Sequence, residues 1–212
     1  MPTPSSSRSV KIPADERTGW SSERPRREGV PPRPVDVSVR SRVLRPSDRL
    51  RYSPGSLLLV VGAKASDLDR LLERWIEERG VTFSLAKVRG LLAGRVPEEQ
   101  IEARAHELLD AAVSKRIQAG QTVVVALETL DEDERRHFVQ IAHGHRRPRH
   151  LLLVETSRDQ VRDEERPPLD ELRRTLDAGE LGAEGFHTAL RLAGSALAEL
   201  NRIVFRPAPQ DD

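Results

Sequence analysis

The sequence contains no cysteine and few aromatic residues, which make up 3% of its 212 residues. The absence of cysteine excludes disulfide bonds, thiolate metal sites and cysteine nucleophiles. With so few aromatic side chains, the core has to be built from Leu, Val, Ala and Ile. Long apolar runs are also missing, because the longest one, 57–61, is far shorter than the roughly 20 residues that cross a bilayer. No apolar segment follows the first basic residues, so we expect a cytoplasmic protein without a secretory signal or a membrane contact.

The formal net charge of +1 hides an uneven distribution along the chain. Residues 1–50 hold 11 Lys+Arg against 6 Asp+Glu, a balance of +5, whereas residues 51–212 hold 24 against 28, a balance of −4. The segment 1–34 is rich in Pro, Ser and Arg and poor in apolar residues, a composition that cannot offset its own ordering entropy. We therefore predict a disordered basic arm over 1–50, a folded domain over 51–206 and a short tail over 207–212. A basic arm suits a nucleic acid or an acidic protein partner, and a solvated linker is the simpler interpretation.

From residue 53 onward, short apolar runs alternate with amphipathic segments. Such runs are typical of strands buried on both faces, and helical segments between them predict βαβ units with a parallel sheet. The predicted fold is a three-layer α/β sandwich with a parallel sheet of four or five strands. The predicted strands are 57–62, 81–84, 122–127, 150–155 and 203–205, and the predicted helices are 67–80, 86–92, 97–119, 131–143, 169–178 and 186–199.

The turn after the first strand is where an open parallel sheet binds ligands. A phosphate-binding loop has the pattern G-x-x-x-x-G-K-[ST], in which main-chain N–H groups and the lysine hold phosphate and the hydroxyl holds magnesium. Counted from Gly62, the second glycine falls on Asp67, the lysine on Leu68 and the hydroxyl residue on Asp69. We expect the two carboxylates to cap the following helix and to repel a triphosphate. The residues of this degenerate phosphate loop are Gly62, Lys64, Ser66, Asp67, Leu68 and Asp69.

Several later segments resemble, in order and spacing, the P-loop kinases of the polynucleotide-kinase and zeta-toxin-like type. Residues 84–89 resemble the family's S-D-x-x-R element, with Arg89 matched and Ala86 at the catalytic aspartate. Residues 119–130 resemble its glycine-and-strand element, with Ala126 at the strand-end aspartate. Glu128 lies two residues further on and is a poor geometric substitute for that aspartate. Arg135 and Arg136 match the arginine-containing helix, Arg158, Arg162 and Arg166 match the arginine-bearing lid, and Glu184-Gly185-Phe186 matches the late E-G-F element.

The resemblance implies a P-loop NTPase-like fold whose scaffold is retained while its chemical positions are replaced. We therefore expect a pseudoenzyme without kinase activity, catalytic residues or cofactor, acting through an unidentified protein partner or a nucleic acid. A first alternative is a divergent phosphotransferase that binds ATP and magnesium, with Lys64 and the lid arginines replacing the missing lysine and Asp69 and Glu128 as metal ligands. A second alternative is a nucleic-acid-binding protein that uses the basic arm.

Two basic clusters have competing interpretations. Arg158, Arg162 and Arg166 would form a cationic face for phosphate, or a solvated helix with ion pairs to interleaved acidic residues. The segment 143–150 gathers three histidines and three arginines. It has no neighbouring carboxylate or cysteine to complete a metal site, so we expect a loop before a strand and no bound metal, with contact to a phosphate backbone as the functional option.

Overall fold

The structure is a computed structural model that describes residues 50–78, 80–155 and 161–206. The predicted arm, except for its last residue, and the predicted tail lie outside the described residues. Leu50 does not belong to the arm, because it is buried and begins strand β1. None of the helices in the described ranges is long and apolar enough to cross a membrane.

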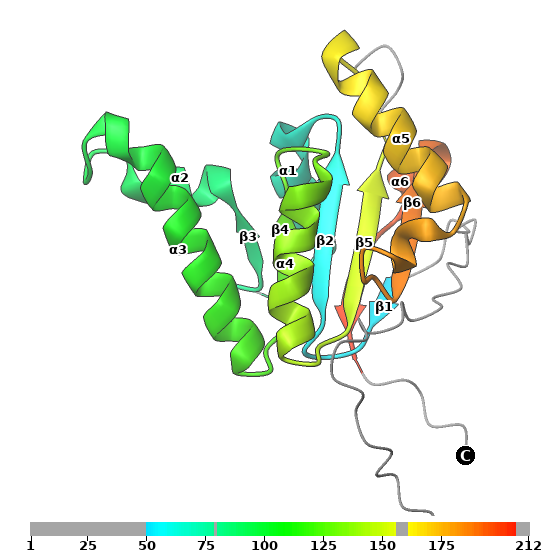
Figure 1. Ribbon diagram of the computed structural model, residues 1–212, viewed down its shortest axis with the longest axis horizontal. Coiled ribbons are helices and arrows are strands. Elements are labelled where there is room, and N and C mark those ends of the chain that lie inside the picture. The colour runs from blue at the N-terminus through cyan, green and yellow to red at the C-terminus, as the bar shows by residue number, and fades with distance from the viewer. Residues whose placement is uncertain (1–49, 79, 156–160, 207–212) are drawn as a thin grey trace, which may run out of the picture. The chain divides into compact units, whose positions relative to one another are not determined.

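The described chain alternates strands and helices as the sequence predicts (Figure 1). The strands are β1 (Leu50–Tyr52), β2 (Leu57–Gly62), β3 (Thr82–Ser84), β4 (Val123–Ala126), β5 (Arg149–Val154), β6 (Thr188–Leu192) and β7 (Ile203–Phe205). The α-helices are α1 (Ala65–Trp75), α2 (Leu85–Leu92), α3 (Glu98–Gln118), α4 (Glu132–Gly144), α5 (Arg166–Asp177) and α6 (Gly194–Glu199). Two single turns of 3-10 helix, η3 (Asp163–Glu165) and η4 (Glu180–Gly182), flank α5.

Five strands form one parallel sheet in the order β3-β4-β2-β5-β6. Every residue of β2, β4 and β5 is buried, which explains their uninterrupted apolar sequences. The predicted fold class, a three-layer α/β arrangement around a parallel sheet, is confirmed. The strand expected at 203–205 exists, but it pairs with β1 in a separate two-stranded parallel sheet.

Successive residues of each strand face opposite layers, so the sheet has two cores. Leu57, Leu59 and Val61 pack against α3, α4 and α5, whereas Leu58 and Val60 pack against α1 and the β1–β7 pair. The chain leaves β2 toward the α1 layer and leaves the neighbouring β4 toward the α4 layer. The topological switch point, where open α/β sheets bind ligands, therefore lies at the carboxyl ends of β2 and β4.

Two of the predicted helices are wrong in part. The segment 186–199 is not one helix, because 188–192 pairs with β5 as strand β6 and only 194–199 is helical. Ala189 and Leu192, the buried residues of β6, are three residues apart, a spacing that fits a helix as well as this short strand. Pairing with β5 decides that the segment forms a strand. Helix α1 ends at Trp75 rather than near Gly80, since Ile76 has extended φ/ψ and is buried beside the β1–β7 pair.

A buried histidine links the two sheets at the start of β5. His150 is 8% exposed, its ring centroid lies 4.7 Å from that of Tyr52, and its Nδ1 lies 2.7 Å from the Thr188 hydroxyl. Burial, assisted by the neighbouring His187 and Arg149, lowers the pKa of His150 from 6.5 to about 4. His150 is therefore neutral in the folded protein near neutral pH.

This burial predicts a loss of stability in mild acid. Below pH 6.5 the unfolded chain takes up a proton at His150, whereas the folded chain does so only near pH 4, so stability falls as the pH falls through that window. The expected loss from pH 7 to pH 5 is about 2 kcal/mol. Urea unfolding at both pH values should show a smaller loss for His150→Phe and an unchanged loss for His145→Gln, a change at an exposed histidine. Equal losses in all three proteins would contradict the assignment.

Candidate functional site

The strand-to-helix turn after β2 contains only two residues, Ala63 and Lys64, before α1 begins at Ala65. Gly62 is required by close packing, because a Cβ there would lie 2.8 Å from the main-chain oxygen of Val154. The same Cβ would lie 3.3 Å from the Leu68 side chain, so α1 sits directly on the end of β2. The turn is therefore tight and has no extended segment of main chain that encloses an empty space.

The three positions that the phosphate-loop register assigns all lie inside α1. Leu68, at the lysine position, is 1% exposed and belongs to the core beneath α1. Asp67 accepts ion pairs from Lys64 at 2.9 Å and from Arg70 at 3.2 Å. The expectation that Asp67 and Asp69 cap the helix is wrong. The N-cap residue of α1 is Lys64, and among the described residues no side chain accepts a capping hydrogen bond there. Both carboxylates instead contact other side chains, while Ser66 is exposed on the first turn.

Asp69 connects α1 to the start of α2. The Ser84 hydroxyl donates a hydrogen bond to Asp69 Oδ2 at 2.7 Å and accepts one from the main-chain N–H of Lys87 at 3.2 Å. The Lys87 ammonium lies 3.6 Å from Asp69 Oδ1 and 3.4 Å from Glu73. Ala86, at the expected catalytic aspartate, is exposed on the first turn of α2.

Arg89 is held between two glutamates at the same edge. Its guanidinium binds both carboxylate oxygens of Glu102, at 2.6 and 2.7 Å, and donates to Glu128 at 2.5 Å. These bonds raise the pKa of Arg89 and lower the pKa of Glu102. Ala126, at the expected strand-end aspartate, is the buried last residue of β4. Glu128, two residues further on, is bound to Arg89. Sequence analysis missed Glu102, since nothing local marks its contact with a residue 13 positions away.

The carboxyl of Glu134, in the first turn of α4, has a shifted pKa. Burial raises the pKa of Glu134, against the opposing effect of a hydrogen bond donated by Thr129. The neighbouring negative charges of Glu128 and Asp131 raise it further. Asp131 caps α4 as predicted, accepting from the N–H of Asp133 at 3.4 Å. The β4–α4 turn is thus acidic where it faces the switch point.

The expected lid arginines are placed only in part. Arg158 lies outside the described residues. Arg162 pairs with Glu164 and Glu165, and Arg166 pairs with Asp163 at 2.8 Å. Both arginines are exposed in these pairs around η3, which matches the solvated-segment interpretation of this cluster.

A buried ion pair that sequence analysis missed joins α4 to the segment before β6. Arg135 on α4 binds both carboxylate oxygens of Glu184, at 2.8 and 2.9 Å, and both side chains are 5% exposed. Arg135 also donates to the main-chain oxygen of Leu130 at 2.6 Å. The pair fixes the segment before β6 to the first turns of α4. Both residues belong to predicted motifs, but no sequence signal joins positions 49 residues apart.

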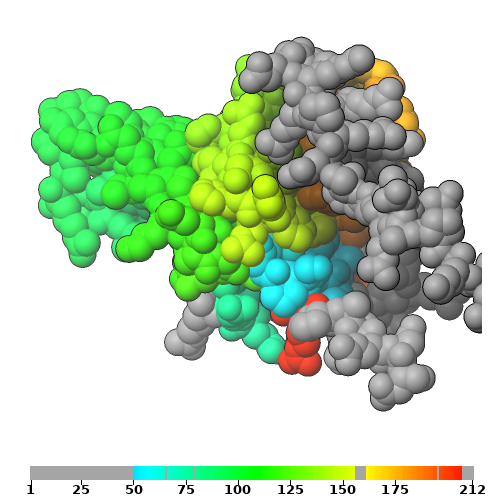
Figure 2. Space-filling view, turned by 60° about the horizontal axis from the view of Figure 1, so that its bottom comes forward, coloured from blue at the N-terminus to red at the C-terminus, as the bar shows by residue number. Residues whose placement is uncertain are grey.

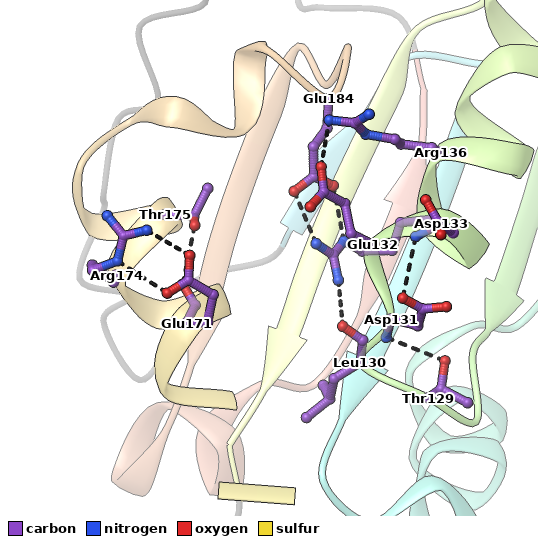
Figure 3. A network of polar contacts seen from close by, with 11 residues as sticks. Thr129, Leu130, Asp131, Glu132, Asp133, Arg136, Glu171, Arg174, Thr175 and Glu184 are labelled. Carbon is purple, nitrogen blue, oxygen red and sulfur yellow. Dashed lines mark hydrogen bonds and ion pairs between the residues drawn. The ribbon is translucent and has the colours of Figure 1, made fainter. Parts of the chain in front are cut away.

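A pocket of about 370 Å³ lies beside this pair, between α4 and α5. Figure 3 shows its polar side chains as two groups, with Glu132, Arg136 and Glu184 near α4 and Glu171, Arg174 and Thr175 on α5. Arg136 pairs with Glu132, and Arg174 pairs with Glu171 at 2.5 Å. The arginines of the pocket are therefore neutralised by its own carboxylates.

The segment 143–150 is divided by the fold. Arg149 and His150 are buried in β5, and Arg149 donates to the main-chain oxygen of Gly185 at 2.6 Å. His143, His145 and Arg146 are exposed. In the described ranges, no group of three His, Asp or Glu residues is arranged to hold a metal ion.

The fold and the position of its switch point define a P-loop NTPase-like α/β domain. The chain matches the family model described as AAA domain (AAA_33) over residues 57–167, which is more than half of its 212 residues. The chain belongs to this AAA domain family. Among solved structures it is similar to the tunicamycin resistance protein of Deinococcus radiodurans, with 16% identity and a TM-score of 0.37 over 68% of this chain and 91% of that chain. No curated protein matches the chain.

Proposed function

We propose that this chain is a non-catalytic P-loop-kinase-like module that acts by binding a protein or nucleic-acid partner. The observation that carries the proposal is the tight turn after β2, with Leu68 in the core where the phosphate-binding lysine would stand. A P-loop needs several consecutive main-chain N–H groups around the phosphates and a lysine reaching them. The two-residue turn and the buried Leu68 meet neither requirement.

The charges at the carboxyl edge support the same proposal. Lys64, Lys87 and Arg89 are each held by carboxylates at this edge. To bind a triphosphate, these cations would have to leave their partners, and Asp67 and Asp69 would then face the phosphates. Since like charges in contact repel strongly in a partly buried site, the edge disfavours nucleotide binding.

Thermal unfolding with and without millimolar Mg-ATP and Mg-GTP tests the proposal. A native site saturated at 100 times its dissociation constant would add about 2.7 kcal/mol and raise the melting temperature by at least about 5 °C. We expect no such shift, and no transfer of phosphate from ATP to the 5′ end of RNA or DNA.

A control variant makes this test specific. If a shift or phosphate transfer is found and Lys64→Ala abolishes it, the divergent phosphotransferase is the correct function and the proposal fails. If Lys64→Ala leaves a shift intact, the nucleotide binds elsewhere, and loss of the original phosphate loop still stands.

A further inference from the structure

The amino edge of the sheet, opposite the switch point, carries a basic patch that two distant segments build together. Its residues are Lys115 and Arg116 from the last turn of α3, and His143, His145 and Arg146 from the end of α4. Arg147 connects the two segments, because its Nε donates to the main-chain oxygen of Ile117 at 3.3 Å. Figure 2 shows this face, where the end of α4 and the chain that follows it lie beside the turn between β1 and β2.

The cations of this patch differ from those of the carboxyl edge in how they are paired. Among the ion pairs of the described residues, Lys64, Lys87 and Arg89 each take part, whereas Lys115, Arg116 and Arg146 do not. Arg116 lies over the Phe83 ring at 5.5 Å. The patch is thus a concentration of positive charge on a domain that is acidic overall.

The backbone at Arg146 gives a second, independent observation. Arg146 has φ 55° and is the one non-glycine residue with positive φ in the described chain. Its N–H donates to His143 and the N–H of Arg147 donates to Ala142, both at 2.9 Å, which is the Schellman ending of α4. Glycine usually occupies this position because an L-residue is strained there. A strained arginine at an exposed helix end indicates that its side chain is used.

We propose that this amino-edge patch binds the phosphodiester backbone of a nucleic acid, a partner class that the proposed non-catalytic function allows. A backbone of regularly spaced phosphates requires clustered cations and little else. Protein interfaces instead depend on aromatic or arginine anchors that are buried in well-packed pockets at their centre. In the described residues the exposed large apolar side chains are Leu91 and Leu108, and both lie outside the patch. The surface therefore suits phosphate better than protein, and binding should show little sequence selectivity.

Anisotropy titrations of the full chain with labelled single-stranded RNA, single-stranded DNA and duplex DNA test this proposal. We expect binding at 50 mM KCl that weakens steeply toward 200 mM, because phosphate contacts release counterions. In the double variant Lys115→Gln/Arg146→Gly, the slope of log K against log salt should be smaller by about 2, with a loss on the order of 10-fold per cation at 50 mM. Preference among the three probes then identifies the kind of nucleic acid.

Two controls separate a local surface from general effects of charge and stability. Arg95→Gln/Arg104→Gln removes the same charge from two exposed positions, one just before α3 and one in its first half, and should retain the wild-type slope. Arg146→Gly alone should keep or raise the melting temperature while it weakens binding, because glycine relieves the strain at positive φ. If Arg146 had only a structural role, the melting temperature and the affinity would change together in this variant.

Three outcomes would overturn the proposal. These are absence of binding to every probe at 50 mM KCl, equal losses in the patch and control variants, and equally effective competition by polyglutamate of the same length. The last would identify an acidic protein as the partner. None of them bears on nucleotide binding, so this proposal and the loss of kinase activity stand or fall separately.

Discussion

Replacing Arg135 with alanine should lower the free energy of unfolding by about 3–5 kcal/mol. Removal of the guanidinium leaves the Glu184 carboxylate buried without its partner, and it also removes the donor to the Leu130 oxygen. Since small domains are stable by about 5–15 kcal/mol, this change alone removes a large fraction of that stability. Urea unfolding followed by circular dichroism measures the effect.

Two further variants distinguish the buried pair from ordinary surface charge. Arg136→Ala, next along the same helix, removes a half-exposed partner of Glu132 and should cost at most about 1 kcal/mol. Arg135→Met/Glu184→Leu should recover much of the loss, because a buried ion pair replaced by apolar side chains is often nearly neutral. A single Arg135→Ala variant as stable as Arg136→Ala would show that Glu184 remains solvated and that the pair is not buried in solution.

Replacing Leu68 with lysine should cost at least about 3 kcal/mol and should not create a nucleotide site. Loss of a buried leucine side chain costs about 2–5 kcal/mol, and the charged ammonium has to be buried or the helix displaced. By sequence register this substitution restores the P-loop lysine, yet the structure places that position under α1 against the sheet. Urea unfolding gives the stability, and thermal unfolding with Mg-ATP gives the binding.

Ser66→Lys is the matched control for this substitution. Ser66 is exposed on the first turn of the same helix, so a lysine there should change stability by less than about 0.5 kcal/mol. If Leu68→Lys proved as stable as this control and gained a thermal shift with Mg-ATP, the turn after β2 would have to open in solution, and the proposed loss of the phosphate site would be wrong.

The elements best predicted from sequence are those specified by their own residues. β2, β4 and β5 are apolar throughout, and such runs between turn residues remain strands in any α/β arrangement. Helix α4 begins as predicted because Asp131 is a local cap, bonding to an N–H two residues further along the chain. The helix predicted over 188–192 was wrong for the opposite reason. The spacing of its apolar residues allows a helix, and its strand form depends on bonds to β5.

The candidate site was predictable only as a set of positions. The sequence placed Gly62 at a strand end and predicted, by register, that Asp67, Leu68 and Asp69 stand where a P-loop has other residues. It did not show that α1 starts at Ala65, which shortens the turn to two residues. Nor did it show that Arg89 is occupied by Glu102 and Glu128, because those contacts join α2, α3 and the end of β4.

The sequence by itself determined the fold class and the chain order of the buried strands, because these depend on apolar periodicity. From residue identity it also predicted the replacement of the P-loop residues. Tertiary structure alone decided which charges meet. It joined Arg135 to Glu184, buried His150 beneath the β1–β7 pair, and brought the end of α3 beside the end of α4. These contacts follow from strand order and helix packing, which bring together residues far apart in the chain, and a single sequence carries no local record of such pairings.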